Sequence, residues 1–275
     1  MEHTVAIQGI QGSFHHQVAL TYFNTNVETL HCLSFSKLVG ALVNESCKHA
    51  VMAIENSIAG SILPNYALID QNNLQIVGEY YMDIQQHLMV LPGQLISDIK
   101  EVHSHPMALL QCQSFFAQYP SIKLVEDVDT AATAARIREH NLKGIGAIGS
   151  VLAAELFELE VLASHIQTVK NNSTRFLILE KKSFEDQYNA TNKVTLKFVL
   201  ADEMGSLASV LAVLHSCQLN MTKIQSLPVV ENPWHYSFFV DLTYKHIKDL
   251  KNGLQLLTGL TTELKILGAY NDARL

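Results

Sequence analysis

The hexapeptide NNSTRF at residues 171–176 concentrates side chains that could perform chemistry. Two amides, two hydroxyls and one guanidinium fill five consecutive positions, Asn171 to Arg175, in a chain with only 16% charged residues. Apolar runs of strand character flank it at residues 160–163 and 176–179. A polar loop would explain such a peptide by itself. The same residue types suit electrostatic or acid catalysis on a small anion.

Polar clusters also follow four other apolar runs that are predicted to be strands. The clusters are GIQGSFHHQ, ENSIAGS, SHP and IGS, after the runs at residues 5–9, 50–56, 101–105 and 144–148. In open α/β sheets, ligands bind beyond the carboxyl ends of the strands, where helix N-termini present unpaired N–H groups. Several such N-termini at one cleft would bind a negatively charged ligand without a basic surface. The pattern therefore predicts an anion-binding cleft in a chain of net charge −7.

Several common kinds of site lack their motifs. The turn GIQGSF lacks the G-x-G-x-x-G pattern, and neither G-x-x-x-x-G-K-[ST] nor G-x-S-x-G occurs, which argues against dinucleotide, nucleoside triphosphate and serine-elbow sites. No His, Cys, Asp and Glu residues have metal-ligand spacing, so no metal site is expected.

The composition is that of a globular protein. Hydrophobic residues make up 48% of the 275 residues, enough for a sizeable core, and the length suggests two units. The net charge of −7 and a sequence pI near 6.0 argue against a nucleic-acid partner. No run approaches the ~20 apolar residues of a membrane span. The four cysteines stand singly within apolar stretches, and no basic leader precedes TVAIQG, so we expect a cytoplasmic protein with reduced thiols and no membrane partner.

The elements that must position these side chains alternate along the first 180 residues. The sequence predicts strands at 5–9, 50–56, 101–105 and 144–150, and further strands with a bend within 74–93. It predicts helices at 15–24, 61–71, 106–119, 130–140 and 151–158. This alternation indicates an α/β architecture with a largely parallel sheet.

A second unit follows the polar stretch at residues 183–193, which is expected to be a linker. Strands are predicted at 194–202, 221–230, 235–244 and 263–270, and helices at 205–218 and 247–260. The order β-α-β-β-α-β is the ferredoxin-like plan, with two antiparallel strands around ENPW.

With these residues in view, the chain resembles prephenate dehydratase over nearly all of its length. GIQGSFHHQVA is similar to the family's G-x-x-G-[ST]-[FY] opening, IENSIAGSI to I-E-N-S-x-x-G, SHPMALLQC to S-H-P-x-A-L-x-Q-C, and NNSTRF to N-x-x-T-R-F. The second unit resembles an ACT regulatory domain through EMGSLASVLAVL, LNMTKIQSLP, PWHYSFFVDL and LGAY. The resemblance implies a two-lobed, periplasmic-binding-protein-like (type II) catalytic domain at residues 1–182 and an ACT domain at 194–275. The expected lobes are 1–74 with 160–182, and 75–159.

The family converts prephenate to phenylpyruvate in phenylalanine biosynthesis, with loss of water and carbon dioxide and without a metal or organic cofactor. The resemblance implies that Thr174 donates a hydrogen bond or a proton to the departing hydroxyl. Because a threonine hydroxyl is a weak acid, we favour a polarising donor held by its neighbours. Arg175 would hold a substrate carboxylate or else pair with Glu55. Phe176 would be core, or a wall against the substrate ring.

Other motif residues have both a structural and a functional interpretation. Asn56 and Ser57 could cap the helix that follows them or bind the substrate, and Ser13 could likewise cap a helix or donate to a carboxylate. Gln111 is expected to be scaffold. The implied catalytic residues are Asn56, Ser57, Thr174, Arg175 and Phe176, and the implied substrate-binding residues are Gly12, Ser13, Glu55, Gly60, Ser61, His105, Asn172 and Ser173.

ACT domains pair side by side and commonly bind an amino acid at the interface, which in this family is usually phenylalanine. The resemblance places that site on Met204, Gly205, Ser206, Leu207 and Ala208, and on Lys223, Ile224, Gln225, Ser226, Leu227 and Pro228. The second stretch departs from the family's E-S-R-P, because Gln225 replaces the acid and Leu227 the arginine. Phenylalanine could still be held by backbone groups near 205–207, with weaker or altered inhibition. The alternative is a dimerisation module without an effector.

Two other functions fit the sequence at this point. Arogenate, with an amine in place of the keto group, could be the substrate, or the chain could be a non-catalytic small-molecule sensor with an ACT output. The intact T-R-F motif argues against a sensor. No helical segment of chorismate mutase size precedes TVAIQG, so we expect no fused mutase, and we expect a homodimer or homotetramer.

Overall fold

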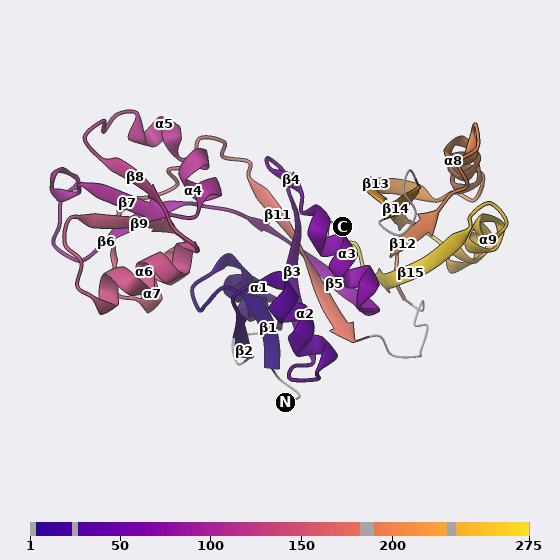
Figure 1. Ribbon diagram of the computed structural model, residues 1–275, viewed down its shortest axis with the longest axis horizontal. Helices are drawn as coiled ribbons and strands as arrows, with labels where there is room; N and C mark the ends of the chain where they lie inside the picture. The colour runs from indigo at the N-terminus through magenta and orange to yellow at the C-terminus, as the bar shows by residue number, and fades with distance from the viewer. Residues whose placement is uncertain (1–3, 24–26, 182–189, 230–234, 275) are drawn as a thin grey trace. The chain divides into compact units, whose positions relative to one another are not determined.

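The computed structural model describes residues 4–23, 27–181, 190–229 and 235–274. These residues form three β-sheets with their covering helices (Figure 1). The chain divides into two compact units, Met1–Ser61 with Tyr81–Phe176, and Ile62–Tyr80 with Leu177–Leu275. The division therefore passes within strands β5 (Leu74–Asp83) and β11 (Ser173–Lys181).

The first sheet has the strand order β2-β1-β3-β11-β5, with β4 paired to β3. Its other elements are β1 (Thr4–Gln8), α1 (Phe14–Phe23), β2 (Glu28–Cys32), α2 (Phe35–Val43), β3 (His49–Asn56), β4 (Gly60–Ser61) and α3 (Leu63–Gln71). Strand β1 pairs in parallel with β2 and with β3, as strands joined through helices do. Residues 50–54 of β3 are all buried, which is typical of a parallel strand covered on both faces.

The second sheet has the order β10-β6-β9-β7-β8. Its elements are β6 (His87–Val90), the 3-10 turn η1 (Ile96–Asp98), β7 (Glu101–Ser104), α4 (Pro106–Gln111), α5 (Gln113–Phe116), β8 (Lys123–Glu126), α6 (Thr130–Glu139), β9 (Ile145–Gly149), α7 (Val151–Leu156) and β10 (Glu160–Ala163). Leu88 and Val90 of β6 belong to the core formed with α4 and α5, whereas Met89 and Leu91 belong to the core formed with α6 and α7. Both faces of this sheet are therefore covered (Figure 1).

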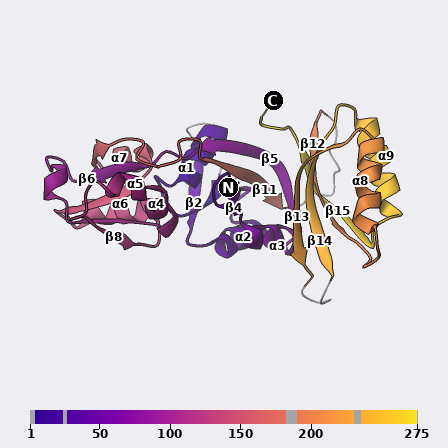
Figure 2. The same cartoon turned by 90° about the horizontal axis from the view of Figure 1, so that it is seen from above.

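The third sheet is antiparallel and has the order β13-β14-β12-β15. Its elements are β12 (Lys193–Val199), α8 (Ser206–Ser216), β13 (Asn220–Pro228), β14 (Tyr236–Thr243), α9 (Ile247–Thr258) and β15 (Glu263–Tyr270). Helices α8 and α9 cover one face (Figure 2), where Val194, Leu196 and Phe198 of β12 enter the core.

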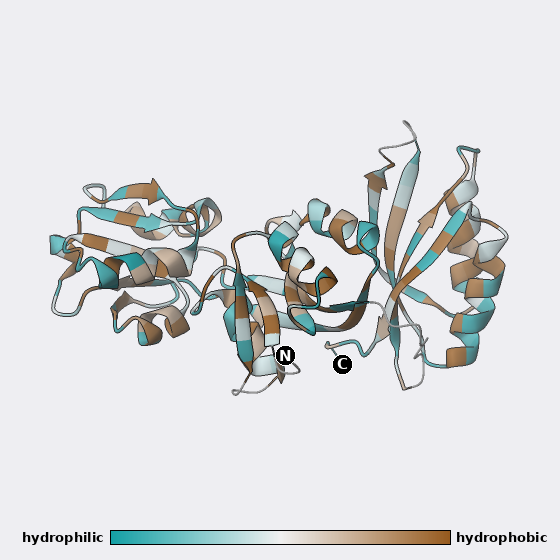
Figure 3. Cartoon of the chain, turned by 60° about the horizontal axis from the view of Figure 1, so that its bottom comes forward, coloured by the Kyte–Doolittle hydropathy of each residue, from teal (hydrophilic) through white to brown (hydrophobic). Residues whose placement is uncertain are grey.

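The intervening residues of β12, Lys193, Thr195 and Lys197, point to the opposite face of this sheet, because side chains alternate along a strand. Figure 3 shows hydrophilic and hydrophobic residues following one another along the strands of this sheet. That face packs on the segment at residues 62–80, which belongs to the same compact unit. The ring of Tyr66 in α3 lies 5.3 Å from that of Phe239 in β14, measured between centroids. The third sheet is therefore buried on two sides, by its own helices and by α3 with the first part of β5.

The predicted fold class is confirmed, with an α/β part followed by a βαββαβ domain. The sequence patterns missed β2, α2 and β8, and the helix expected at 106–119 is divided into α4 and α5. Most of the expected linker and the ENPW turn, residues 182–189 and 230–234, lie outside the described residues. None of the described helices is long and apolar enough to cross a membrane.

The packing of β15 on β5 predicts a severe effect of Gly268→Ala. A methyl group at residue 268 would overlap the carbonyl oxygen of Ile76 and lie 2.7 Å from its Cβ, so the two strands must separate. We expect a loss of about 1–3 kcal/mol or more in the free energy of unfolding, measured by urea denaturation. The matched control is Gly259→Ala, where the nearest atom is a carbonyl oxygen at 3.6 Å and the change should stay within about 0.5 kcal/mol. Equal stability of the two variants would contradict the packing described here.

Candidate active site

The side chain of Asn56, at the end of β3, has a fixed orientation. Its Oδ1 accepts hydrogen bonds from the backbone N–H groups of Ile58, at 3.0 Å, and Ala59, at 2.9 Å. A backbone N–H can only donate, so the oxygen must face this turn and the amide NH2 must face the other way. The turn at residues 56–59 therefore determines where the Asn56 donors point.

The Asn56 donors point at the N-x-x-T-R-F segment, although 116 residues or more separate the two in the chain. Nδ2 lies 2.9 Å from Thr174 Oγ1, 2.6 Å from Asn172 Oδ1 and 3.3 Å from the Ser173 carbonyl oxygen. Thr174 is thus an acceptor in its bond to Asn56. In the described part of the chain no group accepts the Thr174 hydroxyl proton, so this proton is available to a ligand. Thr174 is 9% exposed.

Asn172 continues the network towards the second sheet. It is fully buried, and its Nδ2 donates to Gln111 Oε1 at 3.1 Å, which also accepts from Gln86 Nε2 at 3.4 Å. Gln111 Oε1 therefore has two donors, and within the described residues its own NH2 has no acceptor. Gln86 Oε1 is buried without a partner. The sequence analysis expected Gln111 to be scaffold and did not single out Gln86. The sequence feature that could have indicated Gln86 is the polar pair QQ, which interrupts the apolar strands at 74–93.

Ser57 holds the two loops together. Its N–H donates to the Ser173 carbonyl at 2.8 Å, and its hydroxyl accepts from the Ser173 N–H at 3.0 Å and donates to the Asn171 carbonyl at 3.5 Å. The Ser173 hydroxyl donates to the Met82 carbonyl at 3.4 Å. These two serines thus connect the ends of β3, β5 and β11 next to Thr174.

Arg175 is 3% exposed and forms an ion pair with Glu55, with 3.3 Å between Nη1 and Oε1. Its guanidinium carbon also lies 5.9 Å from the centre of the Tyr81 ring, within the range of a cation–π interaction. Of the two interpretations of Arg175, the structure contains the pairing with Glu55. Because the Glu55 side chain is 27% exposed, the pair reaches the surface through Glu55.

Phe176 is 1% exposed and packs in the core beneath this segment. Its ring meets the buried ring of His15 edge-on at 5.0 Å, and His15 Nε2 accepts a hydrogen bond from the Ala53 N–H at 3.3 Å. Burial lowers the pKa of His15 from 6.5 to about 3, so the imidazole is neutral. His15 therefore connects α1, β3 and β11.

The glycine-rich turn after β1 approaches the N-terminus of α7. Gly12 has φ +84°, and a Cβ there would lie 2.9 Å from the Ala153 Cα. The Ser150 hydroxyl, which caps α7, donates to the Gly12 carbonyl at 2.6 Å. Ser13 is buried, and its hydroxyl accepts from the His16 N–H at 3.2 Å, so it caps the helix that follows. The turn packed against α7 therefore needs glycine at residue 12, because another residue could not fit there.

The remaining expected residues have local structural contacts. Gly60 has φ +83° and pairs with Asn56, and Ser61 pairs with Glu55, in the short ladder between β3 and β4. His105 is exposed and begins α4, and its Nδ1 accepts from the Met107 N–H at 3.3 Å. The hydrogen bonds thus bring together residues 56–57 and 172–174, whereas they do not join Ser13 or His105 to this group.

The network at Asn56 and Thr174 is built of uncharged donors, with the ion pair of Arg175 and Glu55 beside it. In the described segments, no group of three or more His, Cys, Asp or Glu side chains could hold a metal ion. Such donors can stabilise negative charge on an oxygen without becoming charged themselves. The family model for prephenate dehydratase matches residues 5–184, more than half of the chain. The chain belongs to the prephenate dehydratase family.

Curated relatives cover nearly the whole chain. The bifunctional chorismate mutase/prephenate dehydratase of Enterobacter agglomerans is 32% identical over 270 residues, which are 97% of this chain and 70% of that protein. The chloroplastic arogenate dehydratase/prephenate dehydratase 2 of Arabidopsis thaliana is 33% identical over 276 residues, 97% of this chain and 72% of that protein.

Solved structures share the fold over both parts of the chain. Prephenate dehydratase from Arthrobacter aurescens, in complex with L-Phe, has a TM-score of 0.88 at 25% identity and covers 98% of this chain and 90% of its own. GqqA, described as a novel type of quorum quenching acylase, also has a TM-score of 0.88, at 28% identity and 97% of both chains. The expected resemblance and the two-lobed type II fold with a C-terminal ACT domain are confirmed.

The neutral state of His15 predicts a pH dependence of stability. The pKa is lowered on folding, so the stabilisation is complete above pH 6.5 and is lost as the pH falls from 6.5 towards 3. The difference in unfolding free energy between the wild type and His15→Gln should shrink by about 1.4 kcal/mol per pH unit in that window. Urea denaturation between pH 7.5 and 4.5 measures it. His31→Gln, at an exposed histidine, is the control, and a pH-independent difference for His15→Gln would contradict the assignment.

Proposed function

We propose that the chain catalyses the decarboxylative dehydration of prephenate to phenylpyruvate, with Thr174 as the hydrogen-bond donor to the departing hydroxyl. The observation that carries the proposal is the direction of the bond between Asn56 and Thr174. Asn56 donates to Thr174 Oγ1 at 2.9 Å, and the turn at Ile58 and Ala59 prevents the opposite orientation of the amide. The threonine proton is therefore directed away from Asn56.

The reaction needs little more than such a donor. The bond between the ring and its carboxylate breaks, and the electron pair forms the last double bond of the aromatic ring while the C–O bond opposite breaks. Carbon dioxide and hydroxide leave, and the hydroxide becomes water by taking a proton from solvent. Because aromatisation drives the reaction, the charge that develops on the departing oxygen is the part that a protein can stabilise. A hydroxyl that donates without ionising suits this role, and no metal or organic cofactor takes part in it.

The carboxylates of the substrate require further donors near Thr174. Gln111 presents an amide NH2 whose oxygen already accepts from Asn172 and Gln86, so its orientation is fixed. Arg175 lies beside Thr174 in sequence and carries a guanidinium, which is paired with Glu55. We assign the catalytic domain to residues 1–182 and the ACT domain to 194–275, in a cytoplasmic enzyme. The two lobes are assigned as expected from the sequence, 1–74 with 160–182, and 75–159.

Removal of the Thr174 hydroxyl is expected to abolish most of the activity. Thr174→Ala should lower kcat by about a hundredfold to a thousandfold, as loss of one transition-state donor does, with a small change in KM. Thr174→Ser keeps the hydroxyl and is the matched control, which should retain activity within about tenfold. The measurement is phenylpyruvate formation from prephenate. Near-normal turnover of a folded Thr174→Ala variant would contradict the assignment.

The substrate is assigned by comparing two acids that differ at one group. Arogenate is the alternative, because the Arabidopsis relative is named for both activities. Parallel assays with prephenate and arogenate decide between them. The same preparation should be tested on an N-acyl amide, since one structural relative is described as an acylase; its description names no substrate beyond that class.

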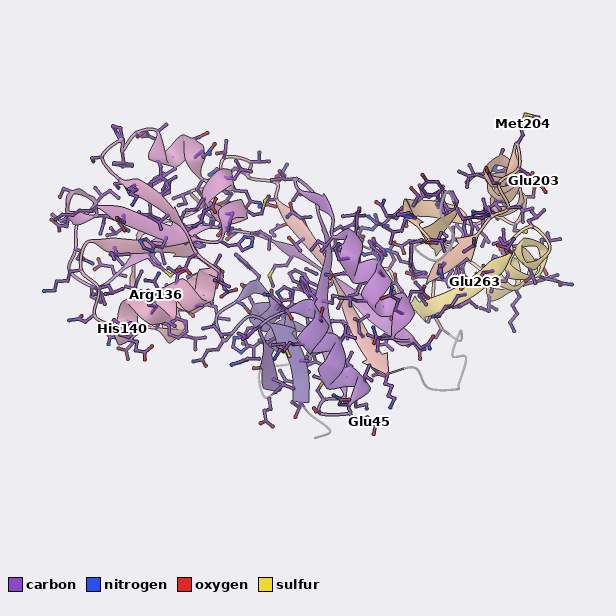
Figure 4. All side chains as sticks on the ribbon, in the orientation of Figure 1. Glu45, Arg136, His140, Glu203, Met204 and Glu263 are labelled. Atoms are coloured by element: carbon purple, nitrogen blue, oxygen red, sulfur yellow. The ribbon has the colours of Figure 1, made fainter. Side chains whose placement is uncertain are left out.

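The ACT domain contains a cavity at the start of α8. It is lined by Leu200, Ala201, Asp202, Glu203, Ser206, Leu207, His235, Tyr236 and Phe238. Two of the expected effector residues, Ser206 and Leu207, line it, whereas Met204 is fully exposed at the turn before α8 (Figure 4). The stretch at 223–228 lies in β13, an edge strand of the sheet, where it would meet a second subunit. L-Phe in the Arthrobacter aurescens structure supports phenylalanine as the effector. We assign a homodimer or homotetramer as the assembly, as expected from the sequence.

Phenylalanine is expected to bind this cavity. At about 100 times its Kd it should raise the unfolding free energy by ~2.7 kcal/mol, seen as a higher melting temperature. Leu207→Trp would fill the cavity and remove the shift, whereas Leu256→Trp, at an exposed position of α9, is the control and should keep it. No shift with L-phenylalanine, or an equal shift with D-phenylalanine, would contradict the site.

A further inference from the structure

Lys193 at the start of β12 is fully buried, on the face of the ACT sheet opposite α8 and α9. Its Nζ lies 2.8 Å and 3.0 Å from the two carboxylate oxygens of Glu79 in β5 and 3.6 Å from Asp272 Oδ1. The Glu79 side chain is itself fully buried, and Glu79 Oε1 also accepts from the Ala273 N–H at 3.1 Å. The first part of β5 is thus joined to the ACT domain by an ion pair inside the protein.

Such a pair is weak evidence for stability, because desolvation offsets most of the attraction between buried charges. Its best supported use is to fix one packing arrangement against alternatives. The arrangement here is close: the backbone of Ile76, three residues before Glu79, touches Gly268 of β15. Glu79 therefore holds β5 at one position along the ACT sheet.

From Glu79, β5 leads directly to the catalytic segment. Tyr81 lies two residues further on, on the same side of the strand as Glu79, and its ring centre is 5.9 Å from the Arg175 guanidinium carbon. Arg175 precedes the core residue Phe176 and follows Thr174, and it pairs with Glu55 next to Asn56. A shift of β5 would therefore change the contacts of Arg175, which lies between Thr174 and Phe176 in β11.

The other end of this connection is the cavity of the ACT domain. Strand β12 leads from Lys193 to Leu200, which lines the cavity. In β14, Phe238 lines the cavity and stacks on Phe198, with ring centroids 5.4 Å apart, while its neighbour Phe239 contacts Tyr66 of α3 on the opposite face. The cavity and the segment at 62–80 therefore contact adjacent residues of β14.

We propose that Tyr81 and Glu79 are positioning residues for Arg175, and that Lys193 makes the ACT sheet part of the support of Arg175. Glu79 acts through Tyr81, so the two residues form one path from the ACT domain to Arg175. This inference rests on the proposed dehydratase function.

The first test removes the contact at Arg175. Tyr81→Leu should lower kcat/KM for prephenate about two- to thirtyfold, the range of a lost cation–π contact. Tyr81→Phe keeps the ring and should restore kcat/KM to within about twofold of the wild type. A kcat/KM for Tyr81→Leu equal to that of Tyr81→Phe overturns the role of the ring.

The second test is a double-mutant cycle between the ion pair and Tyr81. Glu79→Leu/Lys193→Met replaces both charges by apolar groups of similar size, a change that buried pairs tolerate. If Glu79 acts through Tyr81, this change lowers kcat/KM about threefold or more in the wild type and has no further effect in Tyr81→Leu. If the two changes lower kcat/KM by independent factors that multiply, the path is overturned. The path is also overturned if Glu79→Leu/Lys193→Met changes kcat/KM by less than about twofold in the wild type.

The matched control removes another ion pair from the same interface. Asp70 in α3 binds Lys265 of β15 at 2.7 Å and Lys197 of β12 at 2.8 Å. Burial would raise the pKa of Asp70, but hydrogen bonds from Lys197 and Lys265 hold it below its usual value. Because α3 is not part of β5, Asp70→Leu/Lys265→Met should leave kcat/KM within about twofold of the wild type. An equal loss of activity in this control shows a general effect of the interface and overturns the proposal.

Hydrogen exchange gives a readout that does not need turnover. The Glu79→Leu/Lys193→Met variant should exchange the amides of residues 173–176 about tenfold faster than the wild type, and the Asp70→Leu/Lys265→Met variant should not. If the wild type lacks turnover but Glu79→Leu/Lys193→Met still speeds amide exchange at residues 173–176, the proposed function fails and the connection from Lys193 to Arg175 stands. If turnover is normal and neither kinetics nor exchange responds, the connection fails. Should the Glu79→Leu/Lys193→Met variant not fold, the Tyr81→Leu and Tyr81→Phe pair decides, with faster exchange at 173–176 expected only for Tyr81→Leu.

Discussion

The orientation of one amide determines the chemistry of this site. Two backbone N–H groups, at Ile58 and Ala59, can only donate, so the Asn56 oxygen must face them and its NH2 must face Thr174. Reversing the amide would place two donors against each other and leave the threonine oxygen without its partner. The turn after β3 therefore decides that Thr174 Oγ1 accepts a hydrogen bond from Asn56 and that the Thr174 hydroxyl proton points away from Asn56.

The ACT sheet has two different buried faces because its strands alternate between apolar and polar residues. Apolar residues of β12 enter the core under α8 and α9, whereas Lys193 and Lys197 meet carboxylates of the segment at 62–80. Hydrophobic contact holds the helices to the sheet, and paired charges set where α3 and β5 lie on the other face. Since the family model includes residues 62–80, this second face is where the matched region and the regulatory domain meet.

The sequence predicted those parts of the fold in which each element has its own local signal. Buried strands such as 50–56 and the βαββαβ order of the last 80 residues were clear from periodicity and turn residues. Strands β2 and β8 were missed because they are short and Cys32 is the one buried residue in them, so neither has an apolar run. In the site, the motifs named Asn56 and Thr174, but they could not give the direction of the bond between them. Gln86 and the ion pair of Lys193 with Glu79 depend on contacts between residues 25 and 114 positions apart, which no local pattern contains.

The contact of Gly268 with Ile76 limits how this regulatory domain could be exchanged during evolution or in design. A related βαββαβ module could keep its own effector cavity and its helices and still not fit, because its terminal strand must offer a backbone without a side chain where β5 crosses it. It would also need a cation at the start of its first strand to neutralise the buried Glu79. A transplanted ACT domain is therefore compatible with this catalytic domain only when it carries both a glycine at the place of Gly268 and a cation at the place of Lys193.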